Sequence, residues 1–433
     1  MAFLGESMLF SSITFLYYFL PITLACYFLA PKKYRNLVLF FFSLVFYGWG
    51  EPKYLIWMML SIGMGYLFGC LLGRTKSASH RKVLIVIAVL FYLGLLGYFK
   101  LQVTLPVGIS FYTFQILSYV IDVYRQEVAV QKNFVALGTY VTMFPQLVAG
   151  PIVRYSDIEK QLREREVTKA SIWYGVQRFS VGLAKKVLLA NRFGELCAIF
   201  KGSSEISVLY VWMYAIAFTL QIYFDFSGYS DMAIGLGEMM GFHFMENFNY
   251  PYISKTVTEF WRRWHISLGT WFRDYVYIPL GGNRRGLKRQ LVNIFLVWCL
   301  TGVWHGAAWN FLLWGMFYAV LLMFEKCVGI RKGSHLYTMF AVLIGFVLFD
   351  AASVKEAFGT IGNLFGIGGI PLVNAESLYY FKSYLPYLLI GGAAATPLLK
   401  KVSVNLGVVI VLILLATASL IGGSFNPFLY FRF

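Results

Sequence analysis

The sequence predicts an all-α protein that crosses a membrane many times. Of its 433 residues, 59% are hydrophobic and only 13% are charged, whereas soluble domains carry about 25% charged residues. The apolar residues gather in runs long enough for membrane helices. Lys and Arg cluster in the short loops between these runs, as they do in the cytoplasmic loops of membrane proteins. Together these observations indicate a polytopic protein whose main partner is the lipid bilayer.

The first apolar run, residues 8–29, is expected to be a retained membrane span. No Lys or Arg precedes it, whereas a cleaved signal peptide carries its positive charges before its apolar core. The basic loops 32–35, 74–82 and 284–289 are expected in the cytosol, which leaves the N-terminus outside. Further apolar segments are expected at 36–49, 54–72, 83–98, 105–124, 134–148, 170–189, 208–224, 340–349, 384–399 and 406–421.

Three stretches depart from simple spans. Segments 105–124 and 134–148 contain or adjoin prolines and glycines, so we expect tilted, kinked or re-entrant helices there. The most charged stretch, residues 155–169, is expected to be amphipathic and to lie in the cytosol or at the interface. Polar residues after the span 208–224 are expected to cap the next apolar helix; they are Asp225, Ser227, Ser230 and Asp231. Since no long linker or soluble segment is present, we predict one membrane domain over residues 1–433.

The charge and the cysteines argue against several classes of protein. The net charge of +17 is spread over loops and forms no continuous basic face with spaced aromatic residues, so no nucleic acid is expected as a partner. The five cysteines include no CxxC pair and are interpreted as small apolar side chains, although Cys299 lies near His305 and an S-acyl intermediate on it is conceivable. His243 and Glu246 have an HxxE spacing, but one such pair is too little for a metal site, and none is predicted.

Polar side chains concentrate in residues 261–310, which contain two of the five histidines, His265 and His305. If residues 259–275 form one helix, His265 shares a face with Trp261, and two neighbouring stripes carry cations. Such a helix cannot face lipid all round, so we expect it to line a wet cavity or to lie at the interface. An interfacial helix whose arginines reach lipid phosphates is the structural alternative, and it explains His265 less well.

His305 is predicted to lie deep in the membrane. Ten helical residues after the basic loop rise roughly 15 Å, which is half of a hydrocarbon core of roughly 30 Å. The apolar run 291–324 is too long for one span, and residues 301–307 are where a break costs least. Irregular backbone at that depth survives only where it lines a cavity. A neutral imidazole there can accept a proton from a hydroxyl near neutral pH, although a buried histidine can also serve packing alone.

Other catalytic signatures are missing from the sequence. It contains no GxSxG nucleophile turn, no HExxH, no GxxxxGK[ST] loop, no GxGxxG turn and no HxxxxD arrangement. The segments WRRWHISL, WFRDYVYIPLGG, TGVWHG and the terminal FNPFLYFRF resemble the membrane-bound O-acyltransferase family, in its bacterial alginate O-acetyltransferase type. The D-alanyl transfer proteins of teichoic acid modification are a more distant likeness. The segments LPVGISFYTFQILSYVIDVYR and MFPQLVAGPIVRY extend the resemblance over nearly the whole chain.

The resemblance implies a fold, a site and partners. It implies a ring of many transmembrane and re-entrant helices around a central funnel and tunnel in the bacterial cytoplasmic membrane. The family's invariant histidine falls on His305, as general base, and its second polar position falls on His265, which either orients the acceptor or stabilises the oxyanion. The implied co-substrate is a cytosolic acyl thioester, acetyl-CoA or an acyl carrier protein, with no tightly bound cofactor. The implied partners are an exported SGNH or acetyl-esterase-like protein and a polysaccharide acceptor.

Three alternatives remain open on the sequence. A transporter or flippase for an envelope polymer or its precursor also needs broken mid-membrane helices and buried charge. The chain contains no pair of matching halves, and its polar residues concentrate in one stretch, so the transferase is preferred. D-alanyl transfer to teichoic acid is the alternative within the same family. A membrane scaffold without activity predicts that both histidines tolerate alanine.

Overall fold

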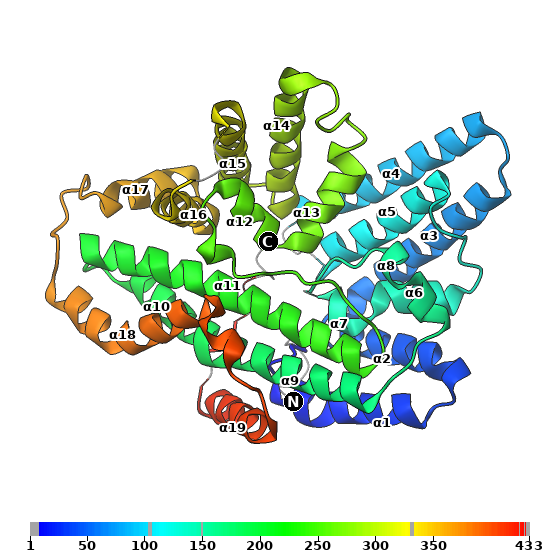
Figure 1. Ribbon diagram of the computed structural model, residues 1–433, viewed down its shortest axis with the longest axis horizontal. Helices are drawn as coiled ribbons and strands as arrows, with labels where there is room; N and C mark the ends of the chain where they lie inside the picture. The colour runs from blue at the N-terminus through cyan, green and yellow to red at the C-terminus, as the bar shows by residue number, and fades with distance from the viewer. Residues whose placement is uncertain are drawn as a thin grey trace. The chain divides into compact units, whose positions relative to one another are not determined.

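The computed structural model describes residues 8–102, 106–148, 150–329, 333–423, 425–427 and 429. In this part of the chain helices are joined by short loops and there is no β-strand (Figure 1), which confirms the all-α prediction. Four helical segments are long and apolar enough to cross a membrane, namely Pro52–Arg74, Ala78–Lys100, Val208–Met239 and Trp309–Val328. The ring around a funnel, the external N-terminus and the cytosolic loops stay predictions, and residues 1–7 and the end of the FNPFLYFRF motif lie outside the described residues.

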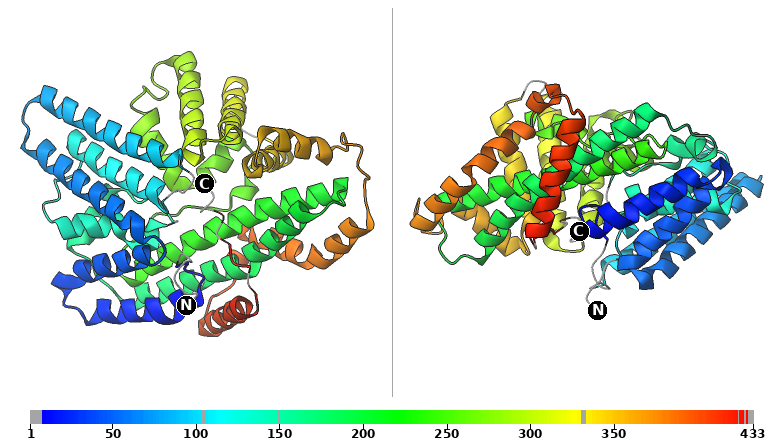
Figure 2. Two further views of the ribbon diagram at one scale, coloured as in Figure 1. Left: turned by 180° about the vertical axis from the view of Figure 1, so that it is seen from behind. Right: turned by 90° about the horizontal axis from the view of Figure 1, so that it is seen from below.

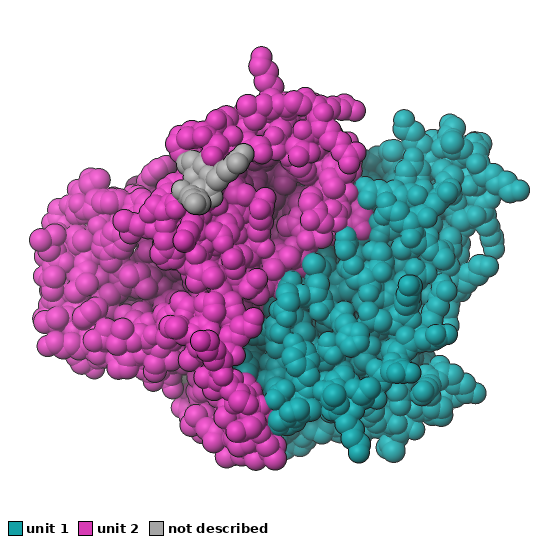
Figure 3. Space-filling model, viewed as in Figure 1, with its two compact units in different colours: residues 1–183, 229–246 teal, residues 184–228, 247–433 magenta. Residues whose placement is uncertain are grey.

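The chain forms two compact units, coloured separately in Figure 3. Unit 1 consists of Met1–Leu183 and Tyr229–Glu246, and unit 2 of Ala184–Gly228 and Asn247–Phe433. Neither unit is one continuous stretch, because helix α11, Val208–Met239, contributes its first part to unit 2 and its last part to unit 1. The single domain expected over residues 1–433 stays a prediction.

Unit 1 contains the first half of the helices. In Figures 1 and 2 helices α3, α4 and α5 lie side by side, and α2 packs on α6. The bounds are α1 Leu20–Leu29, α2 Arg35–Gly50, α3 Leu55–Arg74, α4 Ala78–Lys100, α5 Ile109–Arg125, α6 Phe134–Thr142, α7 Phe144–Leu147, α8 Tyr155–Arg163 and α9 Lys169–Ala184. The interruption expected within 134–148 is confirmed, since α6 ends at Thr142 and α7 begins one residue before Pro145.

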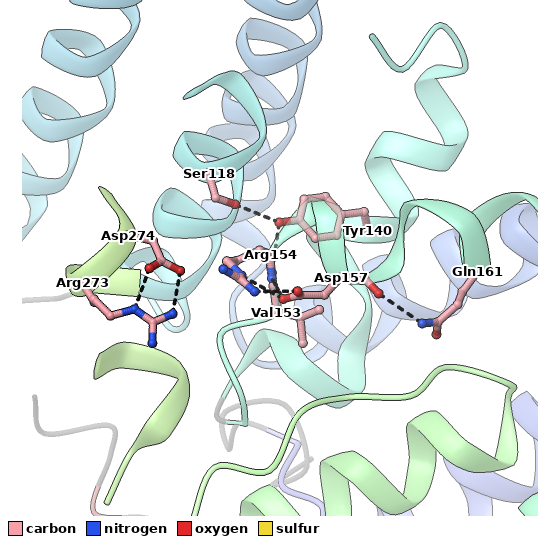
Figure 4. A network of polar contacts seen from close by, with 8 residues as sticks. All are labelled: Ser118, Tyr140, Val153, Arg154, Asp157, Gln161, Arg273 and Asp274. Carbon is pink, nitrogen blue, oxygen red and sulfur yellow. Dashed lines mark hydrogen bonds and ion pairs between the residues drawn. The ribbon is translucent and has the colours of Figure 1, made fainter. Parts of the chain in front are cut away.

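A polar network joins α5, α6 and α8 inside unit 1 (Figure 4). The Tyr140 hydroxyl donates to the Val153 carbonyl at 3.0 Å, and the Arg154 guanidinium pairs with Asp157 at 2.8 Å. Asp157 also accepts from the Arg154 backbone N–H at 3.1 Å, so its carboxylate caps the start of α8. Within the charged stretch expected at 155–169, α8 covers Tyr155–Arg163, with Tyr155, Ile158 and Leu162 buried, and α9 begins at Lys169.

Unit 2 contains the remaining helices. The bounds are the π-helical turn η4 Lys185–Ala190, α10 Asn191–Gly202, α12 Val257–Arg263, α13 Ile266–Phe272, the π-helical turn η6 Arg273–Tyr277, α14 Gly286–His305, α15 Trp309–Val328, α16 His335–Asp350, α17 Val354–Leu364, α18 Ala375–Ala394 and α19 Leu406–Gly422. Helices α14 and α15 form a hairpin and lie next to each other in Figures 1 and 2. Apolar and aromatic residues of α11, α12, α15 and α16 form a continuous core.

The polar residues after position 224 do not cap a new helix, and that prediction is wrong. Helix α11 runs unbroken from Val208 to Met239, so Asp225, Ser227, Ser230 and Asp231 lie in its middle and are all buried. Asp225 pairs with Lys186 and Asp231 with Arg178. These distant cations compensate the buried carboxylates, which removes the physical reason for the helix to end there.

The continuous helix expected over 259–275 is also wrong. Helix α12 ends at Arg263 and α13 begins at Ile266, because His265 adopts left-handed backbone angles with φ 44° and ψ 54°. An extended segment runs beside the break: the Asn249 N–H donates to the Arg263 carbonyl, and the Ile266 N–H donates to the Asn247 carbonyl, each at 2.9 Å. The break therefore leaves these backbone groups satisfied. The predicted pairing of Glu259 with Arg263 is present at 3.0 Å.

Candidate active site

A cavity of about 640 Å³ lies inside unit 2. Its wall is largely aromatic and apolar, with a few polar side chains, which is the usual character of a small-molecule site. The wall comes from α11, α12, α13, η6, α14, α15 and α16, together with Leu429. The residues discussed below that line it are Asp225, Phe226, Trp261, Arg262, His265, Arg273, His305, Trp314, Phe349 and Leu429. His265 and His305, which lie 40 positions apart in the sequence, therefore line the same cavity.

His305 reaches the cavity from the last residue of α14. Gly306 follows in extended conformation and α15 begins at Trp309, so the break predicted near residues 301–307 falls just after the histidine. The imidazole lies edge-on to Trp314 and to Phe349, with ring centroids 5.1 Å apart in each pair. These aromatic contacts make the surroundings of the imidazole apolar, and electrostatic interactions are stronger in such a medium than in water.

His265 reaches the cavity from the break between α12 and α13. Its side chain is only 4% exposed and packs edge-on against Phe226 at 4.7 Å. Its Nδ1 lies 3.1 Å from Oδ1 of Asn247, which is fully buried. The helical stripe expected to carry His265 does not exist, yet the side chain still lines the cavity. The left-handed residue between two short helices, not helical periodicity, places it there.

Positive charge borders the cavity on the side of α12 and η6. Arg262 and Arg273 both line it. Arg273 donates to its neighbour Asp274 at 2.7 Å through Nε and at 3.1 Å through Nη2 (Figure 4). The start of α12 is held by Glu325 of α15, whose carboxylate accepts from the Val257 and Thr258 N–H groups at 2.6 and 2.9 Å. An anion at a helix N-terminus is favourable, and this one fixes the helix that carries Trp261 and Arg262.

A buried ion pair at the cavity wall was missed by the sequence reasoning. Lys186 and Asp225 lie 2.6 Å apart with side chains 2% and 3% exposed. Asp225 also accepts from the Leu429 N–H at 2.8 Å, and Lys186 donates to the Pro427 carbonyl. The pair therefore holds the backbone of Pro427 and Leu429 beside the cavity. An aspartate in mid-span was the available signal, because such a charge is retained only with a partner.

Other predicted residues lie elsewhere. Cys299 is not among the described residues that line the cavity. His243 bonds Glu238 at 2.8 Å, whereas Glu246 pairs with Arg178, so the HxxE residues do not converge. Within the described ranges no group of three His, Cys, Asp or Glu side chains could hold a metal ion. His335 contacts the Ser254 carbonyl at 3.2 Å.

Two histidines line this cavity, and helices of membrane length, α11 and α15, contribute to its wall, as expected for an integral membrane protein with an internal polar site. Comparison with known proteins identifies the class further. The model of the MBOAT, membrane-bound O-acyltransferase, family matches residues 125–341. The chain belongs to this family, and the protein is a multi-pass O-acyltransferase of the bacterial membrane.

Three relatives illustrate the likeness. A probable alginate O-acetylase of Pseudomonas putida is 36% identical over 98% of this chain and 100% of its own length. The peptidoglycan O-acetyltransferase of Helicobacter pylori is 30% identical over 85% of this chain and 81% of its own. The teichoic acid D-alanyltransferase of Bacillus subtilis is 30% identical over 51% of this chain and 59% of its own. These comparisons confirm the family resemblance noted in the sequence.

Proposed function

We propose that the protein transfers an acetyl group from a cytosolic thioester to an acceptor hydroxyl, and that the acetyl group finally reaches the hydroxyls of an extracellular polysaccharide. The proposal rests on one observation: His265 and His305 line the same aromatic-walled cavity of unit 2. The acetyl group and the polysaccharide are suggested by the printed names of relatives, of which the alginate type aligns with 98% of this chain.

In this mechanism His305 is the general base. The acceptor oxygen attacks the thioester carbonyl carbon while the His305 imidazole takes the hydroxyl proton. The carbonyl π electrons move onto oxygen. When that oxyanion collapses, the C–S bond breaks, the thiolate takes the proton back from the imidazolium, and an ester and a free thiol remain. General base catalysis of this kind contributes about 10²–10⁴ in rate.

The oxyanion needs a donor, and two indole N–H groups are suitable. Nε1 of Trp261 and Nε1 of Trp314 are buried, and neither has a hydrogen-bond partner among the residues that the structure describes. Both residues line the cavity. A buried donor left unsatisfied costs about 1–3 kcal/mol, and a substrate oxygen would remove that cost. Trp314 also contacts the His305 ring, so it is the donor nearer to the proposed base.

The surface chemistry suggests the thioester donor, and the family resemblance suggests the exported partner. Residues 284–289 form an exposed basic stretch that runs into the first turn of α14, and its Arg and Lys residues suit the phosphates of acetyl-CoA or the acidic surface of an acyl carrier protein. An exported SGNH or acetyl-esterase-like protein would receive the acetyl group and deliver it to the polysaccharide. No tightly bound cofactor is needed, because the thioester supplies the activated acyl group.

The decisive test replaces His305 by glutamine. Gln retains hydrogen bonding and similar size but cannot accept a proton near neutral pH, so H305Q should lose at least 100-fold in acetyl transfer from a radiolabelled thioester in proteoliposomes. Size-exclusion profiles and thermal unfolding show whether the variant is folded. A folded H305Q enzyme with near wild-type transfer would refute the role of His305.

D-alanyl transfer is the second candidate, favoured by the teichoic acid relative in Bacillus subtilis. The same proteoliposomes decide between the two when they are offered acetyl and D-alanyl thioesters in parallel. Preferential use of the D-alanyl donor selects the second candidate. A transporter or flippase would leave both thioesters intact.

A further inference from the structure

The side-chain amide oxygen of Asn247, Oδ1, has three hydrogen-bond partners. The Ser267 backbone N–H lies at 3.3 Å, the Ser267 hydroxyl at 2.8 Å and Nδ1 of His265 at 3.1 Å. Asn247 and Ser267 are at most 1% exposed, so water does not compete for these bonds. All three residues belong to unit 2.

The backbone N–H of Ser267 fixes the chemistry of this cluster. A backbone amide can only donate, so the Asn247 atom that it contacts must be the acceptor oxygen and not the NH₂ group. That oxygen cannot donate to His265. The hydrogen bond between them therefore requires that the proton be on Nδ1 of the imidazole, which leaves Nε2 as the nitrogen with the lone pair.

We infer that Asn247 is a positioning residue that holds neutral His265 as the Nδ1–H tautomer, so that Nε2 serves as a hydrogen-bond acceptor in the cavity. Nε2 of His265 is buried and has no hydrogen-bond partner among the described residues, while the side chain lines the cavity. On the basis of the proposed function, His265 either orients the acceptor or stabilises the oxyanion, and the Nδ1–H tautomer selects the first role. His265 accepts from the substrate hydroxyl and orients it toward His305, because an acceptor nitrogen cannot stabilise an oxyanion.

The backbone supports the same arrangement. His265 occupies the left-handed region with φ 44°, which costs an L-residue roughly 1–2 kcal/mol. The backbone carbonyl of Asn247 compensates part of this cost by accepting from the Ile266 N–H at 2.9 Å. One asparagine thus binds the histidine ring with its side chain and the neighbouring backbone with its carbonyl. This two-point attachment fixes both the direction and the protonated nitrogen of the ring.

The test reads the tautomer directly by ¹⁵N NMR of histidine-labelled protein at a pH where the rings are neutral. The chain has five histidines, and comparison with H265Q assigns the signal of His265. The wild-type protein should show a protonated Nδ1 and an unprotonated Nε2 at His265. A protonated Nε2 would overturn the inference whatever the enzyme's activity, whereas H305Q separately decides the proposed function.

Two variants at Asn247 complete the test. N247L removes the acceptor at similar volume, so His265 should shift toward the Nε2–H tautomer and kcat/KM for the acceptor should fall at least tenfold. N247D retains an acceptor oxygen and should restore the Nδ1–H signal. An N247L protein with an unchanged His265 signal would contradict the inference. N293L is the matched control: Asn293 is a fully buried asparagine that donates to the Gly282 carbonyl, and its loss should lower stability without altering the His265 signal.

Discussion

The two histidines differ because their neighbours differ. His305 is surrounded by the rings of Trp304, Trp314 and Phe349, whereas His265 is bonded to the amide of Asn247. As the proposed base, His305 takes one proton from the acceptor and returns it in each reaction cycle. In His265, Nδ1 is hydrogen-bonded to an amide oxygen, so Nε2 is left to orient the acceptor.

The proposed oxyanion donor makes a prediction for Trp314. Phenylalanine keeps an aromatic ring against His305 but lacks the indole N–H, so W314F should lower kcat by about 10²–10³, the usual cost of losing one such donor. The measurement is single-turnover acetyl transfer from a saturating thioester.

Trp212 provides the matched control. Its indole Nε1 donates to the Leu364 carbonyl at 2.9 Å, and it does not line the cavity among the described residues. W212F should therefore lower thermal stability and leave kcat within a few-fold of wild type. Equal losses of kcat in the two variants would remove Trp314 from the mechanism.

At the scale of elements, the hairpin of α14 and α15 determines where His305 stands. The two helices approach closely at glycines: a Cβ on Gly302 would lie 2.5 Å from the Phe311 carbonyl oxygen, and one on Gly315 would lie 2.4 Å from that of Trp298. Small residues at a crossing are the usual device for close packing of membrane helices. Gly302 lies one turn before His305, so the spacing of the hairpin sets the depth and direction of the imidazole.

Substitution of Gly315 should separate these helices. G315A places a methyl group against backbone, which cannot yield as a flexible side chain would, and overpacking of this kind costs about 1–3 kcal/mol. We expect a lower unfolding temperature and reduced acetyl transfer. G359A is the control, because Gly359 lies in α17 with nothing within 4 Å of the added Cβ. A G315A enzyme as stable and active as G359A would show that the close crossing is unimportant.

At the scale of the whole molecule, contacts between distant positions complete the cavity. Lys186 of η4, Asp225 of α11 and the backbone of residues 427 and 429 form one buried cluster, although more than 200 positions separate its ends. Isolated buried charges are costly, so each member of the pair needs the other. The cluster supports the cavity wall near Leu429.

A single variant and a double variant test this cluster. K186M leaves the Asp225 carboxylate buried without its cation, which should destabilise the folded protein by about 3–5 kcal/mol. The double variant K186M/D225N removes both charges and keeps an acceptor for the Leu429 N–H, so it should recover most of the lost unfolding temperature. If the double variant is no more stable than K186M in detergent, charge compensation does not account for the stability of this cluster.

The sequence by itself determined the class of the protein, since apolar runs and basic loops follow from the solvent that each segment meets. It also predicted a break within residues 301–307, because the run 291–324 exceeds one span and these residues are its weakest part; the structure places the break after His305. The membership of His305 and His265 in one site came from the motifs TGVWHG and WRRWH. Local pattern suffices for these features because bilayer thickness and helix geometry constrain them.

Only the tertiary structure decided how the site is assembled. The break at His265 depends on hydrogen bonds from residues 247–249, and the buried Asp225 depends on Lys186. Periodicity predicted one helix through His265, and the polar residues after position 224 predicted the cap of a new helix near Asp225, because both patterns are local in the sequence. In both places the free energy is set by partners from distant positions, which satisfy backbone groups at one site and neutralise a carboxylate at the other.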